Sequence, residues 1–413
     1  MFQSSYRRNW DIAKLKMKVL IINYYYYPNM IGGTEQSVKL LAEGLVDNRI
    51  EVAVFTYDGN DISQDNIEGV VIFRDTYNTE SKGVMSQLMR CCNTFWNSKH
   101  YSNLDTIVSY FNPDVVNVNN LFYMSPSIWR FFSKKKIPVI HTIRDSWLEF
   151  PLPLETRCQK ILLSPLIFVW QKFIRRLSNK YAPYVTAPSQ YMIDKFISMS
   201  YFRNAKRAVI PNSINLDIDE TRQIIAEKNL RSSSDIRYLY VGQLVKHKGI
   251  LNLLEVWSSL PDKDITLTIC GDGPLKEMVL SASGNDSRIR YTGQLTKEEL
   301  KEQYIAADVL IVPSIWEETF GRVIIEGNQY GLPVIGSNRG GIPEVLSETG
   351  GGITFQYDSL YDLKHKILQF KNRDVIRYYM NPILDNIEKY QNSNNIDKYI
   401  QLYSEASENS LIK

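Results

Sequence analysis

Short apolar runs alternate with longer amphipathic segments through most of the 413 residues. In the first half, continuously apolar runs predict parallel strands, because a strand that is buried on both faces needs no polar alternation. These runs lie at residues 18–22, 51–55, 70–74, 114–119, 138–142 and 184–189. Helical periodicity predicts helices after Gly33 and at residues 83–111, 126–132 and 161–180. The order of strands and helices predicts an α/β domain.

The second half repeats this alternation, with predicted strands at residues 237–241, 267–270, 290–293, 308–313 and 334–336. A polar helical tail follows from Pro382, and its apolar positions form a docking face: Tyr390, Ile396, Tyr399, Ile400 and Tyr403. We therefore expect two facing Rossmann-like domains with a cleft between them, at residues 17–210 and 211–392. Residues 1–16 are expected to be an N-terminal extension, and residues 393–413 to pack back on the first domain.

Composition narrows the function classes. The net charge of +3 gives no case for a nucleic-acid binder. No signal peptide is recognisable, and the apolar run Ile161–Trp170 is too short to span a bilayer. The four cysteines (Cys91, Cys92, Cys158 and Cys270) form no C-x-x-C pair. This cysteine usage leads us to expect a cytoplasmic protein. We expect no His-based metal site, because only four histidines are present and they are scattered.

Residues 161–180 combine aromatic side chains with lysines and arginines. The pattern fits a basic amphipathic helix that touches the inner face of a membrane. A helix that packs on its own domain gives the same pattern, so both interpretations stay open.

The stretch Trp316–Glu326 follows a predicted buried strand and enters a helix that ends before Gly331. Glu326 lies within that helix among apolar residues, where a carboxylate needs hydrogen-bond donors, and the two hydroxyls of a ribose would supply them. At the helix start, the N–H groups of Thr319, Phe320 and Gly321 suit phosphate or sugar oxygens, close to Glu318. Alternatively, both glutamates are solvated surface residues.

Two loops of the first half also end predicted strands. A glycine pair, Gly32 and Gly33, separates the first strand from its helix and would let backbone approach a ligand, or would simply form a tight turn. His141 and the pair Arg144 and Asp145 lie at the carboxyl end of the strand at 138–142, where α/β sheets bind ligands. The alternatives are a packed histidine and a surface ion pair.

These motifs, taken in order, resemble glycosyltransferase family 4, the retaining nucleotide-sugar transferases of the GT-B fold. The motifs that carry the resemblance are Gly32–Glu35, Ile210–Ile214, Tyr240–Gly242 with Lys248–Gly249, Gly271–Leu275, Pro313–Glu326 and Gly340–Glu344. The resemblance implies that Gly32 and Gly33 close over the donor phosphates, Lys248 binds the diphosphate, Glu318 contacts the donor sugar and Glu326 binds the ribose. It also implies that no cofactor or obligatory metal is needed.

Together, these assignments give two sets of candidate residues. The catalytic set is Glu318, Lys248, Arg144 and Asp145. The substrate-binding set is Gly32, Gly33, His141, Gly242, Gln243, Gly273, Thr319, Phe320, Gly321 and Glu326.

Two positions depart from the family pattern. Gln243 stands where the family usually has an arginine, which removes one positive charge from the diphosphate site. Arg144 stands where many members have a histidine, and it could supply compensating charge from the other domain. The hypothesis fails if Arg144→Ala weakens acceptor binding and leaves nucleotide binding intact. Asp217-Ile218-Asp219 matches a metal-binding D-x-D motif of another transferase class, but it follows the predicted domain crossing, so we interpret it as coincidental.

The function that the resemblance implies is retaining transfer of a hexosyl residue from a nucleotide diphosphate sugar to a glycan acceptor in surface polysaccharide biosynthesis, and we expect the acceptor to be lipid-linked. Two alternatives are a GT-B nucleotide-sugar 2-epimerase and a catalytically silent sugar-binding partner subunit.

Overall fold

The computed structural model describes residues 17–29, 32–59, 63–76, 96–121, 124–149 and 164–411. The chain divides into two compact units. Unit 1 comprises the described residues of Met1–Thr186, Met199–Ala208 and Ile396–Lys413, and unit 2 comprises Ala187–Ser198 and Val209–Asn395.

Unit 1 is built on an eight-stranded sheet in the order β3-β4-β2-β1-β5-β6-β7-β8. Its strands are β1 (Lys18–Ile22), β2 (Glu51–Gly59), β3 (Ser63–Ile67), β4 (Val70–Thr76), β5 (Val115–Val118), β6 (Val139–Thr142), β7 (Tyr184–Ala187) and β8 (Lys206–Val209). Pairing is parallel from β4 to β7, whereas β3 is an antiparallel edge strand. The parallel strands direct their carboxyl ends to one edge of the sheet, which is where the loops with candidate residues lie.

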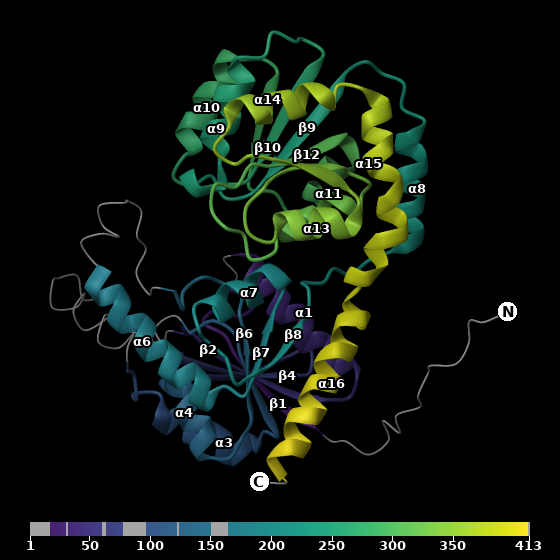
Figure 1. Cartoon of the computed structure of the whole chain (residues 1–413). Helices are drawn as coiled ribbons and strands as arrows, with labels where there is room; N and C mark the ends of the chain where they lie inside the picture. Colours follow the sequence, from purple (N-terminus) through teal and green to yellow (C-terminus); the bar gives the residue numbers. More distant parts are fainter. Residues whose placement is uncertain are drawn as a thin grey trace. The chain divides into compact units, whose positions relative to one another are not determined.

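Helices cover both faces of this sheet (Figure 1). They are α1 (Gly33–Asp47), α3 (Tyr101–Phe111), α4 (Ser127–Lys134), α6 (Ser164–Tyr181) and most of α16 (Asn392–Leu411). The α16 face is identified by Tyr403, whose hydroxyl is hydrogen-bonded to Asn117 of β5. Trp129 of α4 instead packs on His141 of β6, so α4 covers the opposite face.

Unit 2 contains a six-stranded parallel sheet in the order β11-β10-β9-β12-β13-β14. Its strands are β9 (Ile236–Val241), β10 (Ile265–Cys270), β11 (Ile289–Gly293), β12 (Val309–Val312), β13 (Val334–Ser337) and β14 (Gly352–Phe355). Successive residues of β9 face opposite ways, since Tyr238 and Leu239 belong to two different apolar clusters. Each face of the sheet therefore has its own core.

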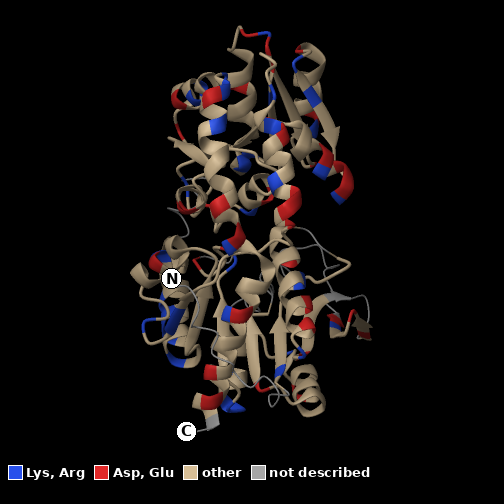
Figure 2. Ribbon diagram, turned by 90° about the vertical axis from the view of Figure 1, so that its right-hand side faces the viewer, with Lys and Arg blue, Asp and Glu red and all other residues tan. Residues whose placement is uncertain are grey.

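The helices of unit 2 are α7 (Gln190–Ser198), α8 (Ile218–Asn229), α9 (Ile250–Ser258), α10 (Lys276–Asn285), α11 (Lys297–Ala306), α12 (Arg322–Asn328), α13 (Ile342–Thr349), α14 (Leu360–Gln369) and α15 (Arg373–Asn386). Two 3-10 turns, η2 (Lys246–Lys248) and η3 (Ile387–Tyr390), precede α9 and α16. Lysines and arginines are interspersed with acidic residues along the ribbon, consistent with the small net charge (Figure 2).

The predicted architecture of two parallel α/β domains is confirmed, and every predicted strand overlaps an observed one. Sequence analysis missed β3, β8 and β14. The predicted helix at 83–111 is wrong over residues 96–100, where hydrogen bonds between Asn97 and the hydroxyls of Ser125 and Ser127 compete with helix formation. The remainder of its first part, residues 83–95, lies outside the described residues, as do residues 1–16 and 161–163.

Two further expectations differ from the structure. Residues 187–198 were expected in the first domain, but they belong to unit 2. The C-terminal helix was expected from Pro382, but this proline lies inside α15, which begins at Arg373.

The expected docking face of the tail is largely buried: Ile396, Tyr399 and Tyr403 are at most 4% exposed. No helix of the described ranges is both long and apolar enough to cross a membrane.

Candidate active site

Glu318 and Lys248 form an ion pair at the carboxyl ends of two strands of unit 2. The Nζ atom of Lys248 lies 2.6 Å from Oε1 of Glu318, which also accepts a hydrogen bond of 2.6 Å from the Ser314 hydroxyl. The side chains keep 30% and 18% of their exposure, respectively, so both can be reached from solvent. The structure thus brings together the two residues that sequence analysis assigned to the donor phosphate and sugar.

The close approach of two loops makes this pair possible. Lys248 lies in the η2 turn after β9, and the next residue, Gly249, has a φ of +75°. A Cβ at Gly249 would lie 1.8 Å from the carbonyl oxygen of Pro313, so only glycine lets η2 pack against the end of β12. The carbonyl of His247 also accepts the N–H groups of Ile315 and Trp316, which ties the two loops together.

A glycine pair after β13, Gly340 and Gly341, packs against the loop that carries Glu318. The N–H of Gly341 donates to the carbonyl of Glu318 over 2.7 Å. Gly340 has a φ of +62°, and a Cβ there would lie 2.1 Å from the same carbonyl oxygen. Sequence analysis used this glycine motif only for the family resemblance. Its structural role is to let the backbone of one loop lie directly against the backbone that carries Glu318.

Replacing Gly340 with alanine is therefore expected to lower the free energy of unfolding by about 1–3 kcal/mol and to displace Glu318. The catalytic rate, measured in the reaction proposed below, should fall by more than the folded fraction does. Gly284→Ala is the matched control, because a Cβ at Gly284, in helix α10, meets nothing within 4 Å. That substitution should stabilise the helix by about 0.5–1 kcal/mol. Equal effects of the two substitutions would contradict the role of Gly340.

The neighbouring carboxylate, Glu317, is held by two basic side chains. It accepts from Lys195 of α7 over 2.6 Å and pairs with Arg339 over 3.3 Å. Burial raises the pKa of Glu317, but the hydrogen bond and charge of Lys195 outweigh it, so the pKa lies below its usual value. The same helix is fixed to the loop by Ser189, whose hydroxyl donates to the carbonyl of Thr319 over 2.6 Å. Glu317 and α7 thus hold the loop in which Glu318 lies.

Glu326 lies within α12 and has one partner on its own helix and one on α11. Its Oε1 accepts from Nε of Arg322 over 2.7 Å, one turn earlier on α12, and the Tyr304 hydroxyl lies 3.5 Å from its Oε2. The side chain is 23% exposed. The expectation of a carboxylate supplied with donors is met by Arg322 and Tyr304, and ribose binding stays a prediction.

The predicted amide donors lie in the turn that leads into α12, which begins at Arg322. Gly321 is the residue before the helix, with a φ of +84°. The ring of Phe320 is 2% exposed and packs 5.7 Å from the ring of Tyr390. Phe320 therefore anchors the turn in the core. The binding roles predicted for the backbone of Thr319, Phe320 and Gly321 stay predictions.

The glycine-rich loops after β9 and β10 are joined by backbone hydrogen bonds. Gly242 donates to Cys270 over 3.1 Å, and Leu244 donates to Asp272 over 2.9 Å. At Gly273, where φ is +154°, a Cβ would lie 2.7 Å from the Leu244 carbonyl oxygen, so the protein itself requires glycine at this position. Gln243 is exposed on this loop, and its carbonyl accepts from the Tyr240 hydroxyl.

Unit 1 has its own group of candidate residues at the carboxyl edge of its sheet. Nε of Arg144 donates to Oδ1 of Asn119 over 2.8 Å, and its Nη2 lies 3.4 Å from the Tyr399 hydroxyl. Asp145 accepts from Nδ2 of Asn120 over 2.7 Å and from the N–H of Trp147 over 2.9 Å. Burial raises the pKa of Asp145 to about 6, and the negative charge of Glu35 adds to the rise. Arg144 and Asp145 do not form the surface ion pair that was the alternative.

A buried polar ladder extends from this group below helix α16. Asn117 accepts from Thr142 over 3.0 Å and from Asn119 over 3.1 Å, and it donates to the Tyr403 hydroxyl. Sequence analysis missed Asn119 and Tyr399 as supports of Arg144. The signal was the two asparagines in the otherwise apolar run at β5, which lie two residues apart and therefore share a face.

His141 lies on the opposite face of the sheet. Its ring stacks on Phe202 at 5.4 Å and meets the edge of Trp129 at 5.1 Å. Burial lowers its pKa to about 3, so the imidazole is neutral. The structure does not bring His141 to Arg144, because His141 packs on Trp129 of α4, whereas Arg144 contacts Tyr399 of α16 on the other face of the sheet. Substrate binding by His141 stays a prediction.

At Gly32, the residue before α1, a side chain would have room. The N–H of Gly32 donates to Oε2 of Glu35 over 2.8 Å, which caps the helix that begins at Gly33. A Cβ at Gly32 would meet only the Glu35 carboxylate, at 3.8 Å. Among the described residues, only the Glu35 carboxylate would lie near such a Cβ, and closure of Gly32 and Gly33 over a ligand stays a prediction.

The D-x-D sequence has the geometry of a helix cap. The carboxylate of Asp217 accepts the N–H groups of Asp219 and Glu220 at the start of α8, and Asp219 pairs with Arg222. Across the part of the chain that the structure describes, no three His, Cys, Asp or Glu side chains are grouped so as to hold a metal.

Known proteins match both halves of the chain. The model of Glycosyltransferase Family 4 matches residues 31–218, and that of Glycosyl transferases group 1 matches residues 221–383. A Klebsiella pneumoniae protein described as an uncharacterized 42.6 kDa protein in the cps region is 26% identical over 320 residues, 75% of this chain and 82% of that protein.

Solved structures share the fold. Sucrose-phosphate synthase from Thermosynechococcus elongatus is 19% identical with a TM-score of 0.75, over 94% of this chain and 98% of that one. Anabaena HepE in complex with UDP and glucose is 16% identical with a TM-score of 0.68, over 94% of this chain and 100% of that one. Two adjoining family models and two whole-chain structural matches thus cover nearly the entire protein.

Proposed function

Because the chain belongs to glycosyltransferase family 4, we propose that it is a retaining, metal-independent enzyme that transfers a hexosyl residue from a nucleotide diphosphate sugar to a glycan. The observation that carries the proposal is the Lys248–Glu318 ion pair of 2.6 Å at the strand ends of unit 2. It places a cation and a carboxylate, both reachable from solvent, beside the loops on which the family resemblance rests.

The chemistry follows from these residue types. The bond between the anomeric carbon and the phosphate oxygen breaks, and the acceptor oxygen bonds to the same carbon. The acceptor proton passes to the leaving phosphate. Lys248 stabilises the negative charge of the diphosphate, and a preorganised donor of this kind is typically worth about 3 kcal/mol. Glu318 positions the sugar and stabilises its developing positive charge.

The donor is the first point to test. HepE was solved with UDP and glucose, which supports a uridine nucleotide for this chain. UDP, GDP and ADP at about 100 times Kd should each be compared by melting temperature, since such binding adds about 2.7 kcal/mol to the free energy of unfolding. We expect one nucleotide to raise the melting temperature without added divalent metal. If none of the three does so, the silent partner subunit replaces this proposal.

The acceptor is proposed to be a lipid-linked glycan of a surface polysaccharide, because the Klebsiella relative lies in a cps region. The proposed location is cytoplasmic and peripheral on the membrane, through α6. Two apolar side chains of this helix are largely exposed, Phe168 at 62% and Val169 at 55%. Cosedimentation with anionic vesicles tests the contact, which Phe168→Ser should weaken.

Incubation with the nucleotide sugar alone separates transfer from 2-epimerisation, because the proposed enzyme leaves the sugar configuration unchanged.

A further inference from the structure

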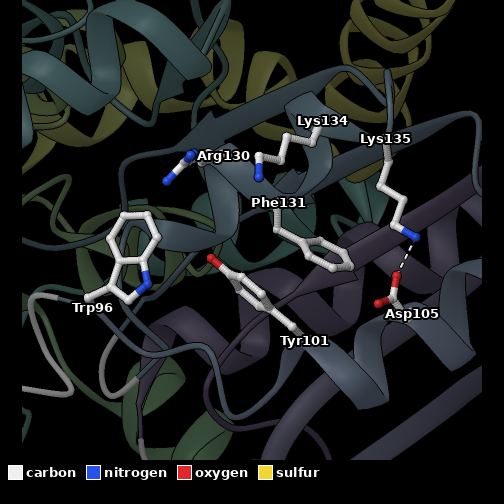
Figure 3. A pocket seen from close by; sticks show the side chains of 7 residues that line it. All are labelled: Trp96, Tyr101, Asp105, Arg130, Phe131, Lys134 and Lys135. Atoms are coloured by element: carbon white, nitrogen blue, oxygen red, sulfur yellow. Dashed lines mark ion pairs between the residues drawn. The ribbon is translucent and has the colours of Figure 1, made fainter.

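A hollow of about 420 Å³ lies between helices α3 and α4 of unit 1, and its lining includes none of the candidate site residues. Figure 3 shows the side chains that line it, with Trp96, Arg130 and Lys134 around one end and the pair of Lys135 and Asp105 at the other. The remaining lining residues are Tyr101 and Phe131. The volume suits one or two sugar rings and is too small for a folded partner.

The charges of the hollow are unbalanced. Its three cations face one carboxylate, Asp105, which forms an ion pair with Lys135. Among the described residues, neither Arg130 nor Lys134 has an ion pair, so two positive charges remain for a ligand. Arg130 lies 5.5 Å from the centroid of the Trp96 ring, which holds the guanidinium at the rim.

The aromatic side chains supply flat apolar surface beside these cations. Trp96 is 38% exposed, so part of its ring is reachable from solvent beside Arg130. Tyr101 and Phe131 pack with ring centroids 4.9 Å apart, and the Tyr101 hydroxyl donates to the carbonyl of Ser127 over 3.0 Å. These contacts fix the floor of the hollow before any ligand arrives.

We propose that this hollow binds an acidic carbohydrate, a short run of sugar rings that carry carboxylates. The C–H face of a pyranose packs on the Trp96 indole, and the carboxylates pair with Arg130 and Lys134. A phosphate headgroup would need the cations alone and would leave the rings unused. The proposal rests on the proposed function, because the bound segment would be a part of the glycan acceptor remote from the sugar that is transferred.

The test uses the full-length protein and titration calorimetry with a tetrasaccharide of galacturonic acid, against maltotetraose as the neutral probe of equal length. We expect the acidic probe to bind at least about ten-fold more tightly, with an affinity that falls as salt rises. The double variant Arg130→Gln with Lys134→Gln and the variant Trp96→Ala should each weaken it about ten-fold. Arg207→Gln, an exposed cation outside the hollow, is the control and should change nothing.

Three results would overturn the proposal. The first is equal binding of the acidic and neutral probes, and the second is binding that the variants leave unchanged. The third is loss of binding to phosphatidylglycerol vesicles in the double variant when no tetrasaccharide binds, which would assign the hollow to a lipid headgroup. Melting temperatures with UDP, GDP and ADP keep the two proposals distinct. If a nucleotide stabilises the wild type and the double variant equally, glycosyl transfer stands even when the acidic carbohydrate fails.

Discussion

Replacing Glu318 with alanine is expected to lower the turnover number about 10²- to 10³-fold while nucleotide affinity largely survives. Glu318 and Lys248 share an ion pair, but only Lys248 carries the charge that a diphosphate needs. Removing the carboxylate frees the lysine for the phosphates and deletes the group proposed to contact the sugar. Initial rates with the nucleotide sugar and melting temperatures with the nucleotide alone measure the two quantities separately.

Glu326→Gln is the complementary variant. It keeps the size of the side chain but removes the charge that pairs with Arg322, and it is expected to weaken nucleotide binding more than it lowers turnover at saturation. If Glu318→Ala loses nucleotide affinity and turnover by equal factors, the assignment of sugar contact to Glu318 and ribose contact to Glu326 is wrong. The comparison is informative because both carboxylates are partly exposed and both have a basic partner.

The parallel strands could be predicted because burial on both faces makes them apolar from end to end. The strand β3, Ser-Gln-Asp-Asn-Ile, could not, because it is an antiparallel edge strand whose first four residues are exposed. It has neither an apolar run nor a clean alternation. Backbone hydrogen bonds to β4 form this strand, and its composition alone does not predict it.

Sequence analysis placed Glu318 and Lys248 in one site but did not predict that they form an ion pair, because 70 residues separate them. What spacing could not reveal is the role of Gly249 and Gly340, whose missing Cβ atoms let distant loops touch. The contact of Arg144 with Tyr399 spans 255 residues and depends on the return of α16 to unit 1. The spacing of apolar residues predicted the docking face of this helix. The contacts of its tyrosine hydroxyls depend on how the helix is positioned along the sheet, which the spacing does not determine.

A cluster that sequence analysis did not identify predicts the largest effect on stability. The carboxylate of Asp308, just before β12, is 1% exposed and is surrounded by three arginines. Arg231 lies 2.8 Å away, Arg373 2.9 Å and Arg237 3.2 Å. Near them, burial lowers the pKa of Lys228 and the charge of Arg231 lowers it further, whereas the charge of Asp308 raises it.

Asp308→Asn is therefore expected to lower the free energy of unfolding by about 3–5 kcal/mol at pH 7, because it leaves three guanidinium groups without a counter-charge. Burial raises the pKa of Asp308, but the hydrogen bonds from Arg373 and Arg237 outweigh it and hold the pKa at about 2, below the ordinary 3.8. The stabilisation from this depressed pKa is complete above about pH 4 and is lost as pH falls toward 2. Urea unfolding at pH 7, 4 and 2 should show the difference between variant and wild type shrinking by about 2 kcal/mol across the last interval.

The control is Asp219→Asn, because Asp219 also pairs with an arginine but its side chain is 85% exposed. A solvated pair of this kind contributes at most about 1 kcal/mol, so the control should change the unfolding free energy little at any of the three pH values. An Asp308→Asn variant as stable as the wild type at pH 7 would mean that the three arginines are adequately solvated or paired elsewhere. A difference that does not shrink between pH 4 and pH 2 would mean that the Asp308 carboxylate does not titrate in this range. In either case the closeness of four charged groups around β12 would reflect packing, and the stability of unit 2 would come from its two apolar cores.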